Sequence, residues 1–225
     1  GTDFYHINGY YVANNKYVYD LKNVEVVYNG RISNDETRDA FFGSRLRFTP
    51  EGIATQETVY LYRPFSQVNF ATSKNDWDNA STFVNDSDKT KRLKSYVEFD
   101  RLPNKFNVMT GDIVPNSYSS NVMFDYNTAP ALQDAHDNED WIRYDGNDYA
   151  WVAMNYILAS KEEMTVSATA KFVHKKNAGN PLTKAVPNVP VKQNYRTNIL
   201  GEFFTGGNMF NIVIVPGFVN SYNNN

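Results

Sequence analysis

Strict period-two alternation over residues 164–173 constrains the fold more than any other feature of this sequence. A strand with one buried and one solvated face gives this pattern, because successive side chains point to opposite faces. Shorter runs rich in β-branched and aromatic residues predict further strands. These lie at residues 24–28, 59–62, 68–70, 96–99, 122–126, 149–158, 199–204 and 210–215.

Turn-forming residues separate several of these strands. Asp145-Gly146-Asn147 predicts a tight hairpin, Gly206-Gly207-Asn208 joins the last two strands, and residues 177–180 join another pair. Short strands connected in this way favour an all-β fold of the antiparallel sandwich type. Two long loops are expected, at residues 73–94, with a helical turn, and at residues 128–140.

One short helix is expected near residue 40. Ser33 is followed three residues later by Glu36, which is the spacing of a capping box. Residues 37–42 would continue the helix, and Gly43 suits the position just after its end.

Composition excludes several classes of function. The chain has 225 residues, a formal net charge of −3 and no cysteine. The charge leaves no basic footprint for nucleic acid, so no nucleic-acid partner is expected. The lack of cysteine excludes thiol nucleophiles, cysteine-ligated zinc and disulfides. No apolar run approaches the roughly 18 residues that a membrane helix needs.

The sequence contains no recognisable catalytic or metal motif. His6, His136 and His174 are far apart in the chain, and His174 is expected at a solvated strand end beside two lysines. The acidic run 134–140 could hold Ca²⁺, but it lacks the regular oxygen spacing of an EF-hand and reads as a flexible loop. We therefore expect no enzyme activity, no cofactor and no metal. A glycosidase would need two carboxylates across a cleft, and no feature selects such a pair.

The tryptophans suggest an alternative that involves binding. Trp77, Trp141 and Trp151 could form an exposed aromatic platform for a sugar, although packing in the core or under loops is the simpler expectation for each.

Five segments, in this order, resemble the fimbrillin-like surface proteins of Bacteroidales, relatives of the type V pilus subunits. The segments are NDETRDAFF (34–42), RPFSQVNF (63–70), LPNKFNVMTG (102–111), AMNYIL (153–158) and VPVKQNYRTNILG (189–201). The likeness extends over about residues 34–216 and depends on the order and spacing of all five.

The resemblance implies a transthyretin-like, Greek-key sandwich, usually with two such domains in a subunit. Residues 1–57 would be a partial N-terminal β domain, and residues 58–225 the C-terminal sandwich. The leading strands of the first domain, and a lipoprotein leader before them, are expected upstream of this chain. The implied location is the cell surface, at the outer membrane, with membrane contact only through that upstream lipid anchor.

The resemblance also implies assembly by strand addition, in which a strand from one subunit completes the sheet of another. The candidate donor strand is 210–215, with Phe210, Ile212 and Ile214 as its apolar contacts. The simpler interpretation keeps this segment as an ordinary strand of its own sandwich. The expected partners are other fimbrial subunits or surface ligands on host or bacterial cells, including glycans.

The sequence thus predicts a non-enzymatic fimbrial or adhesin-type surface protein. The alternative is a carbohydrate-binding surface lipoprotein that uses the aromatic platform.

Overall fold

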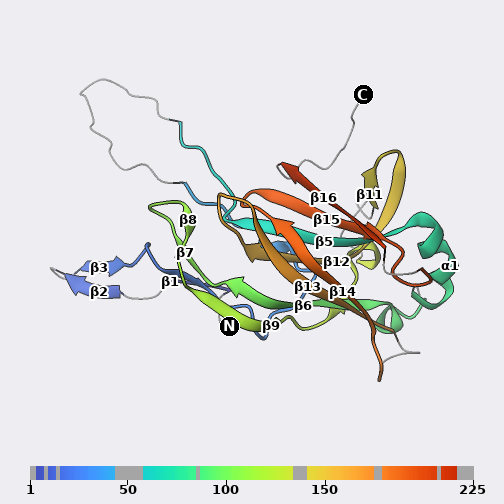
Figure 1. Cartoon of the computed structure of the whole chain (residues 1–225). Coiled ribbons are helices and arrows are strands. Elements are labelled where there is room, and N and C mark those ends of the chain that lie inside the picture. Colours follow the sequence, from blue (N-terminus) through green and yellow to red (C-terminus); the bar gives the residue numbers. More distant parts are fainter. Residues whose placement is uncertain are drawn as a thin grey trace.

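A computed structural model describes residues 4–7, 10–13, 16–43, 58–84, 87–133, 141–174, 179–206 and 209–216. The described chain is mostly β, with one α-helix, and its strands form two packed five-stranded sheets with smaller sheets at one end (Figure 1). The predicted all-β class with one short helix is therefore confirmed.

The first large sheet, called the β5 sheet here, has the strand order β11-β12-β5-β15-β16. Its neighbours are antiparallel except β5 and β15, which run parallel. Their bounds are β5 Phe65–Ser73, β11 Trp141–Tyr144, β12 Asn147–Leu158, β15 Tyr195–Gly201 and β16 Phe210–Pro216.

The second, called the β6 sheet, has the order β10-β6-β13-β14, and β9 also pairs with β6. All of its pairs are antiparallel. The bounds are β6 Lys94–Pro103, β9 Tyr118–Met123, β10 Asn127–Thr128, β13 Met164–Val173 and β14 Leu182–Val191. The period-two alternation of residues 164–173 is that of β13, whose buried side chains face the β5 sheet.

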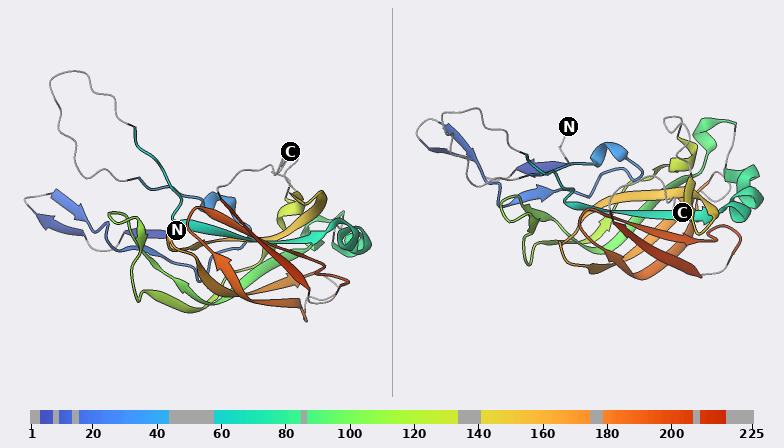
Figure 2. Two further views of the ribbon diagram at one scale, coloured as in Figure 1. Left: turned by 45° about the horizontal axis from the view of Figure 1, so that its top comes forward. Right: turned by 90° about the horizontal axis from the view of Figure 1, so that it is seen from above.

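Smaller elements surround the two sheets (Figure 2). A four-stranded sheet has the order β1-β4-β7-β8, and a hairpin of β2 and β3 projects beyond it. Helix α1 lies at the opposite end of the sandwich. The bounds are β1 Tyr5–Ile7, β2 Tyr10–Ala13, β3 Lys16–Tyr19, β4 Val24–Val26, β7 Lys105–Asn107, β8 Asp112–Ile113, α1 Lys74–Val84, and the 3-10 helices η1 Glu36–Arg38, η2 Lys89–Lys91 and η3 Pro130–Leu132.

Aromatic side chains fill the core between the two sheets. Phe70 of the β5 sheet and Phe172 of the β6 sheet both pack against Phe203, with ring centroids 5.8 and 5.7 Å apart. Phe203 is completely buried and follows β15 in the chain. This residue therefore links the two sheets at the end where α1 lies.

One open side of the sandwich is closed by polar groups from residues 28–34. Tyr28 Oη donates to the Pro103 carbonyl at 2.8 Å and accepts from the Leu158 amide at 2.9 Å, which joins the two sheets. Asn34 is paired twice with Met154: its amide donates to the carbonyl, and its Oδ1 accepts from the Met154 N–H at 2.8 Å. The free edge of β12 is thereby occupied by groups of the same chain.

The expected helix after Ser33 is a single 3-10 turn, η1. Ser33 is buried and turned toward the sheets, where its hydroxyl contacts Asn155 and accepts from the Val97 amide. Asp35 caps the turn instead. The α-helix lies at Lys74–Val84, inside the segment that was expected to be a loop with a helical turn.

Residues 59–62 form no strand; Tyr62 makes only an isolated bridge with Phe42. The predicted hairpins are confirmed between β11 and β12, with Asp145 and Gly146 at positive φ, and between β15 and β16. The domain boundary expected at residue 57 lies outside the described residues, as do parts of the turns at 177–180 and 206–208.

Candidate functional site: a free strand edge and an aromatic pocket

Strand β16 is the last strand of the β5 sheet. It pairs with β15 along its whole length, and no other described strand pairs with it. Its core-side residues are fixed, because Phe210 stacks on Phe203 with centroids 5.2 Å apart and Ile212 also packs against the core. Within the described chain β16 therefore presents one edge of backbone N–H and C=O groups without a strand partner.

The β6 sheet ends nearby in strand β14, and the edge of β14 is interrupted by prolines, unlike that of β16. Pro187 and Pro190 remove two N–H donors from this strand. Asn188 between them has a φ of 54°, and the pairing with β13 shifts in register at this point. Prolines and bulges are devices that prevent a further strand from pairing with an edge. Strand β16 contains no proline before its last residue, Pro216, and its pairing with β15 has no bulge.

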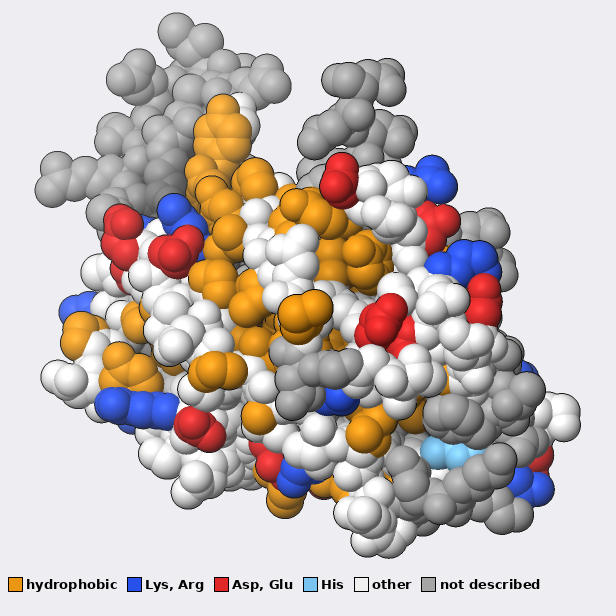
Figure 3. Space-filling view, turned by 45° about the vertical axis from the view of Figure 1, so that its right-hand side comes forward, with side chains coloured by type: hydrophobic (Ala, Val, Ile, Leu, Met, Phe, Trp, Pro, Cys, Tyr) orange, Lys and Arg blue, Asp and Glu red, His pale blue; other side chains and the backbone are white. Residues whose placement is uncertain are grey.

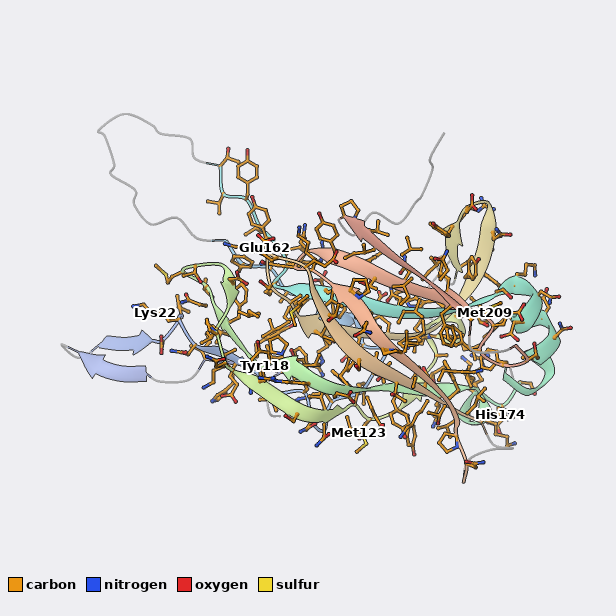
Figure 4. All side chains as sticks on the ribbon, viewed as in Figure 1. Lys22, Tyr118, Met123, Glu162, His174 and Met209 are labelled. Carbon is orange, nitrogen blue, oxygen red and sulfur yellow. The ribbon has the colours of Figure 1, made fainter. Side chains whose placement is uncertain are left out.

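A pocket of about 770 Å³ lies at the end of the sandwich from which residues 58–62 project. Glu162, labelled in Figure 4, lies beside the base of this projecting segment. Aromatic rings, carboxamides, hydroxyls and one ammonium group line the pocket: Phe42, Gly43, Thr58, Val59, Tyr60, Tyr62, Thr110, Gly111, Lys161, Gln193, Asn194 and Tyr195.

The aromatic wall of the pocket is held by backbone hydrogen bonds. Phe42 and Tyr62 exchange two N–H···O=C bonds of 2.9 Å each. The Phe42 ring also packs edge-on against Phe106, with centroids 4.8 Å apart. Gly111 lets this ring approach, because a Cβ built there would lie 2.9 Å from it. The wall is thus fixed on the sandwich.

The polar side of the pocket comes from two turns. Lys161 Nζ donates to the Thr110 carbonyl at 2.5 Å, and its amide donates to Asp112. Asn194 has a φ of 65°, and its amide donates to the Phe65 carbonyl. The Gln193 amide donates to the Ser160 carbonyl at 2.9 Å. These bonds fix the backbone that carries the Gln193 and Asn194 side chains.

Exposed aromatic and aliphatic side chains lie around this pocket. Tyr60 and Tyr62 are 70% and 49% exposed, and Val59 and Leu61 are also exposed. Figure 3 shows that hydrophobic side chains gather on one face of the molecule, with a projecting group at its upper margin. Contiguous exposed apolar surface of this kind typically marks a binding site.

The three tryptophans do not form an exposed platform. Trp77 and Trp151 are buried at 7% and 6% exposure, and only Trp141 is exposed, at 38%. Trp77 packs edge-on against Trp141, with centroids 6.4 Å apart, because α1 lies against this end of the β5 sheet. The aromatic surface that the described chain does present is the pocket above.

His174 is buried, which corrects the expectation of a solvated strand end. It continues the even-numbered face of β13 after Phe172, and that face points into the sandwich. His6 is exposed on strand β1. His136 and the acidic run 134–140 lie outside the described residues. In the part of the chain that the structure describes, no three His, Asp or Glu residues are placed to hold a metal ion.

The Asp76 carboxylate is held by several hydrogen bonds from the fold. Its oxygens accept from the Thr72 hydroxyl, from the Phe204 amide at 2.9 Å and from the Thr205 amide at 2.7 Å. Burial alone would raise the pKa of Asp76, but these hydrogen bonds outweigh it and lower the pKa. The group ties α1 to the chain after β15, which is a structural role.

The candidate donor residues lie in β16. Phe210 and Ile212 are partly buried against their own core, and Ile214 is paired with Thr197 of β15. The segment is an edge strand of its own sandwich in this structure; its service as a donor remains a prediction. No local sequence pattern marks the pocket, because its lining comes from segments far apart in the chain.

Comparison with known proteins gives a family and a distant structure. The model of a family of unknown function, DUF6562, matches residues 9–225. No curated protein matches the chain. One solved structure that matches is described as "a putative cell adhesion protein" from Bacteroides ovatus. It is 14% identical with a TM-score of 0.36, and the match covers 69% of this chain and 45% of that one. No described helix is long and apolar enough to cross a membrane.

Proposed function

We propose that this chain, which belongs to DUF6562, the family of unknown function, is a non-enzymatic surface protein that works by strand addition. In this proposal the edge of β16 accepts a strand from another subunit. The partners are other fimbrial subunits or surface ligands, and the location is the cell surface, with any membrane attachment made through a lipid anchor upstream of residue 1.

The observation that carries the proposal is the contrast between the two neighbouring sheet edges. Strand β14 has two prolines and an Asn at positive φ, whereas the seven residues of β16 lack such protection until Pro216. The opposite side of the sandwich is closed by Tyr28 and Asn34. Of the two neighbouring edges β14 and β16, β16 is therefore the one left able to accept a strand.

An added strand would gain both hydrogen bonds and apolar contacts. Each ladder bond contributes a net of roughly 0.5–1.5 kcal/mol, so several of them give a binding energy that side-chain contacts can extend. Val213 is partly exposed on β16 and is free of the core contacts that hold Phe210. An incoming strand can use such positions without disturbing the fold.

A substitution at the edge tests the proposal. Val213→Lys places a charge on β16 that strand addition would have to bury, and Ala185→Lys is the matched control on the edge strand β14, where Ala185 is exposed. Surface material of the producing cell is separated by size and probed for each variant. Val213→Lys should be missing from the high-mass fraction, and Ala185→Lys should be retained. Equal recovery of both variants, with unchanged melting temperatures, would refute strand addition at β16.

A further inference from the structure

We infer that the pocket between Phe42, Tyr62 and Gln193 binds a sugar residue of an oligosaccharide. This inference goes beyond strand addition and does not depend on it, since the pocket and β16 share no lining residue. The volume of about 770 Å³ lies in the range of small-molecule sites, roughly 300–1,000 Å³.

The carboxamides of the pocket wall suit a ligand rich in hydroxyl groups. Gln193 and Asn194 both line the pocket, and Gln193 is buried, at 7% exposure. The backbone that carries them is fixed by hydrogen bonds to the Ser160 and Phe65 carbonyls, so the two carboxamides are positioned before any ligand arrives. A carboxamide both donates and accepts, which matches a hydroxyl group.

The aromatic rings suit the apolar face of a sugar ring. Phe42 and Tyr62 lie with centroids 6.1 Å apart, and Tyr60 and Tyr195 complete the lining. The face of an aromatic ring carries partial negative charge, which attracts the polarised C–H groups of a pyranose. Because the Phe42 and Tyr62 backbones are paired with each other, the rings are positioned before any ligand arrives.

Charge narrows the class of ligand further. Among the described residues of the lining, Lys161 is the one that carries a charge, and none is Asp or Glu. Its Nζ donates to Thr110, and an ammonium has two further donors for ligand oxygens. An organic cation is therefore disfavoured. A peptide strand is disfavoured as well, because the Phe42 and Tyr62 backbone groups that it would need are already used.

A glycan array with neutral and acidic oligosaccharides, incubated with the full chain, tests the inference. We expect binding to a subset of saccharides, weakened at least tenfold in Tyr62→Ala and in Gln193→Met. Tyr126→Ala is the matched control, because Tyr126 is exposed to a similar degree, at 55%, and lies outside the pocket lining. Absence of binding to the array, or binding that Tyr126→Ala reduces as much as Tyr62→Ala does, would overturn the inference.

The melting temperature of Gln193→Met without ligand separates loss of binding from loss of the fold. Methionine is similar in size to glutamine, so the melting temperature should stay the same while saccharide binding falls. Binding that falls only together with a marked fall in melting temperature would show that Gln193 has a structural role and would contradict the inference. Val213→Lys should leave saccharide binding unchanged, so failure of this inference and failure of strand addition are distinguishable.

Discussion

Asn34 shows how a single residue closes one side of the sandwich. Its φ of 58° places the chain in the left-handed region, which Asn tolerates better than most residues. Its Oδ1 accepts from the Met154 amide, and its Nδ2 donates to Ser95 Oγ at 2.9 Å, so one side chain reaches both sheets. Asn is typical of exposed turns, and this position shows that the same chemistry can serve a buried edge.

Removal of this side chain should destabilise the fold. Asn34→Ala leaves the buried Met154 amide and Ser95 hydroxyl without these bonds, so we expect the free energy of unfolding to fall by about 2–4 kcal/mol. Asn121→Ala is the control, because Asn121 also has a positive φ, 51°, but is exposed. Urea unfolding of both variants measures the difference. Equal losses would mean that the backbone conformation, and not the buried bonds, accounts for the effect.

Asp76 gives a prediction that depends on pH. Its folded-state pKa is lowered below the ordinary value of 3.8, so its contribution to stability is complete above that pH and is lost as the pH falls through the folded-state pKa. Asp76→Asn should lower the free energy of unfolding at pH 7 by about 1–3 kcal/mol. The difference from the wild-type chain should shrink below pH 3.8.

The control for that experiment is Asp78→Asn on the same helix, where the carboxylate forms an exposed ion pair with Lys74. Such pairs contribute little to stability. A difference between Asp76→Asn and the wild-type chain that stays constant from neutral pH to acid would contradict the assigned role.

At the scale of elements, several strands and hairpins were predictable, whereas the length and position of the helices were not. Alternation identified β13, and turn residues identified the hairpins of β11 with β12 and of β15 with β16. A serine followed three residues later by an acidic residue occurs at Ser33 and at Ser73, but only Ser73 begins an α-helix. Ser73 accepts from the Asp76 amide at the start of α1, whereas Ser33 turns its hydroxyl into the sheets and leaves one 3-10 turn. Contacts with distant parts of the chain determine which serine caps a helix, and these contacts cannot be read from the local sequence.

The pocket escaped prediction for a related reason. Phe42, Gly111 and Gln193 lie in three of the five segments that carry the fimbrillin resemblance, but nothing local indicates that these segments meet. Exposed Tyr60 and Tyr62 read as a strand, because β-branched and aromatic residues predict strands wherever they occur.

The edge of β14 offers a prediction about assembly. The double substitution P187T/P190T restores two N–H donors to an exposed edge strand, so the chain should self-associate more strongly than the wild type. Sedimentation velocity at equal concentrations measures the oligomer fraction. Pro181→Thr is the control, because Pro181 precedes the strand. If the double variant and the control sediment alike, the prolines do not protect this edge.

On the scale of the whole molecule, the two sheets have one side closed by their own chain and one side that ends in β14 and β16. The polar groups of Tyr28 and Asn34 occupy the first side. On the second side the prolines protect β14, and β16 is left able to pair. The pocket lies at the end of the sandwich from which residues 58–62 project. We propose that a subunit assembles along one edge and binds a saccharide at one end.

Site-specific photo-cross-linking on the producing cell tests the central claim most directly. A photoreactive side chain is placed at Asn211, which is exposed on β16, and in a second variant at Ala185, which is exposed on β14. We predict that the probe at position 211 captures a second polypeptide and that the probe at position 185 captures none. Capture at position 185 alone, or at neither position, would contradict strand addition at β16.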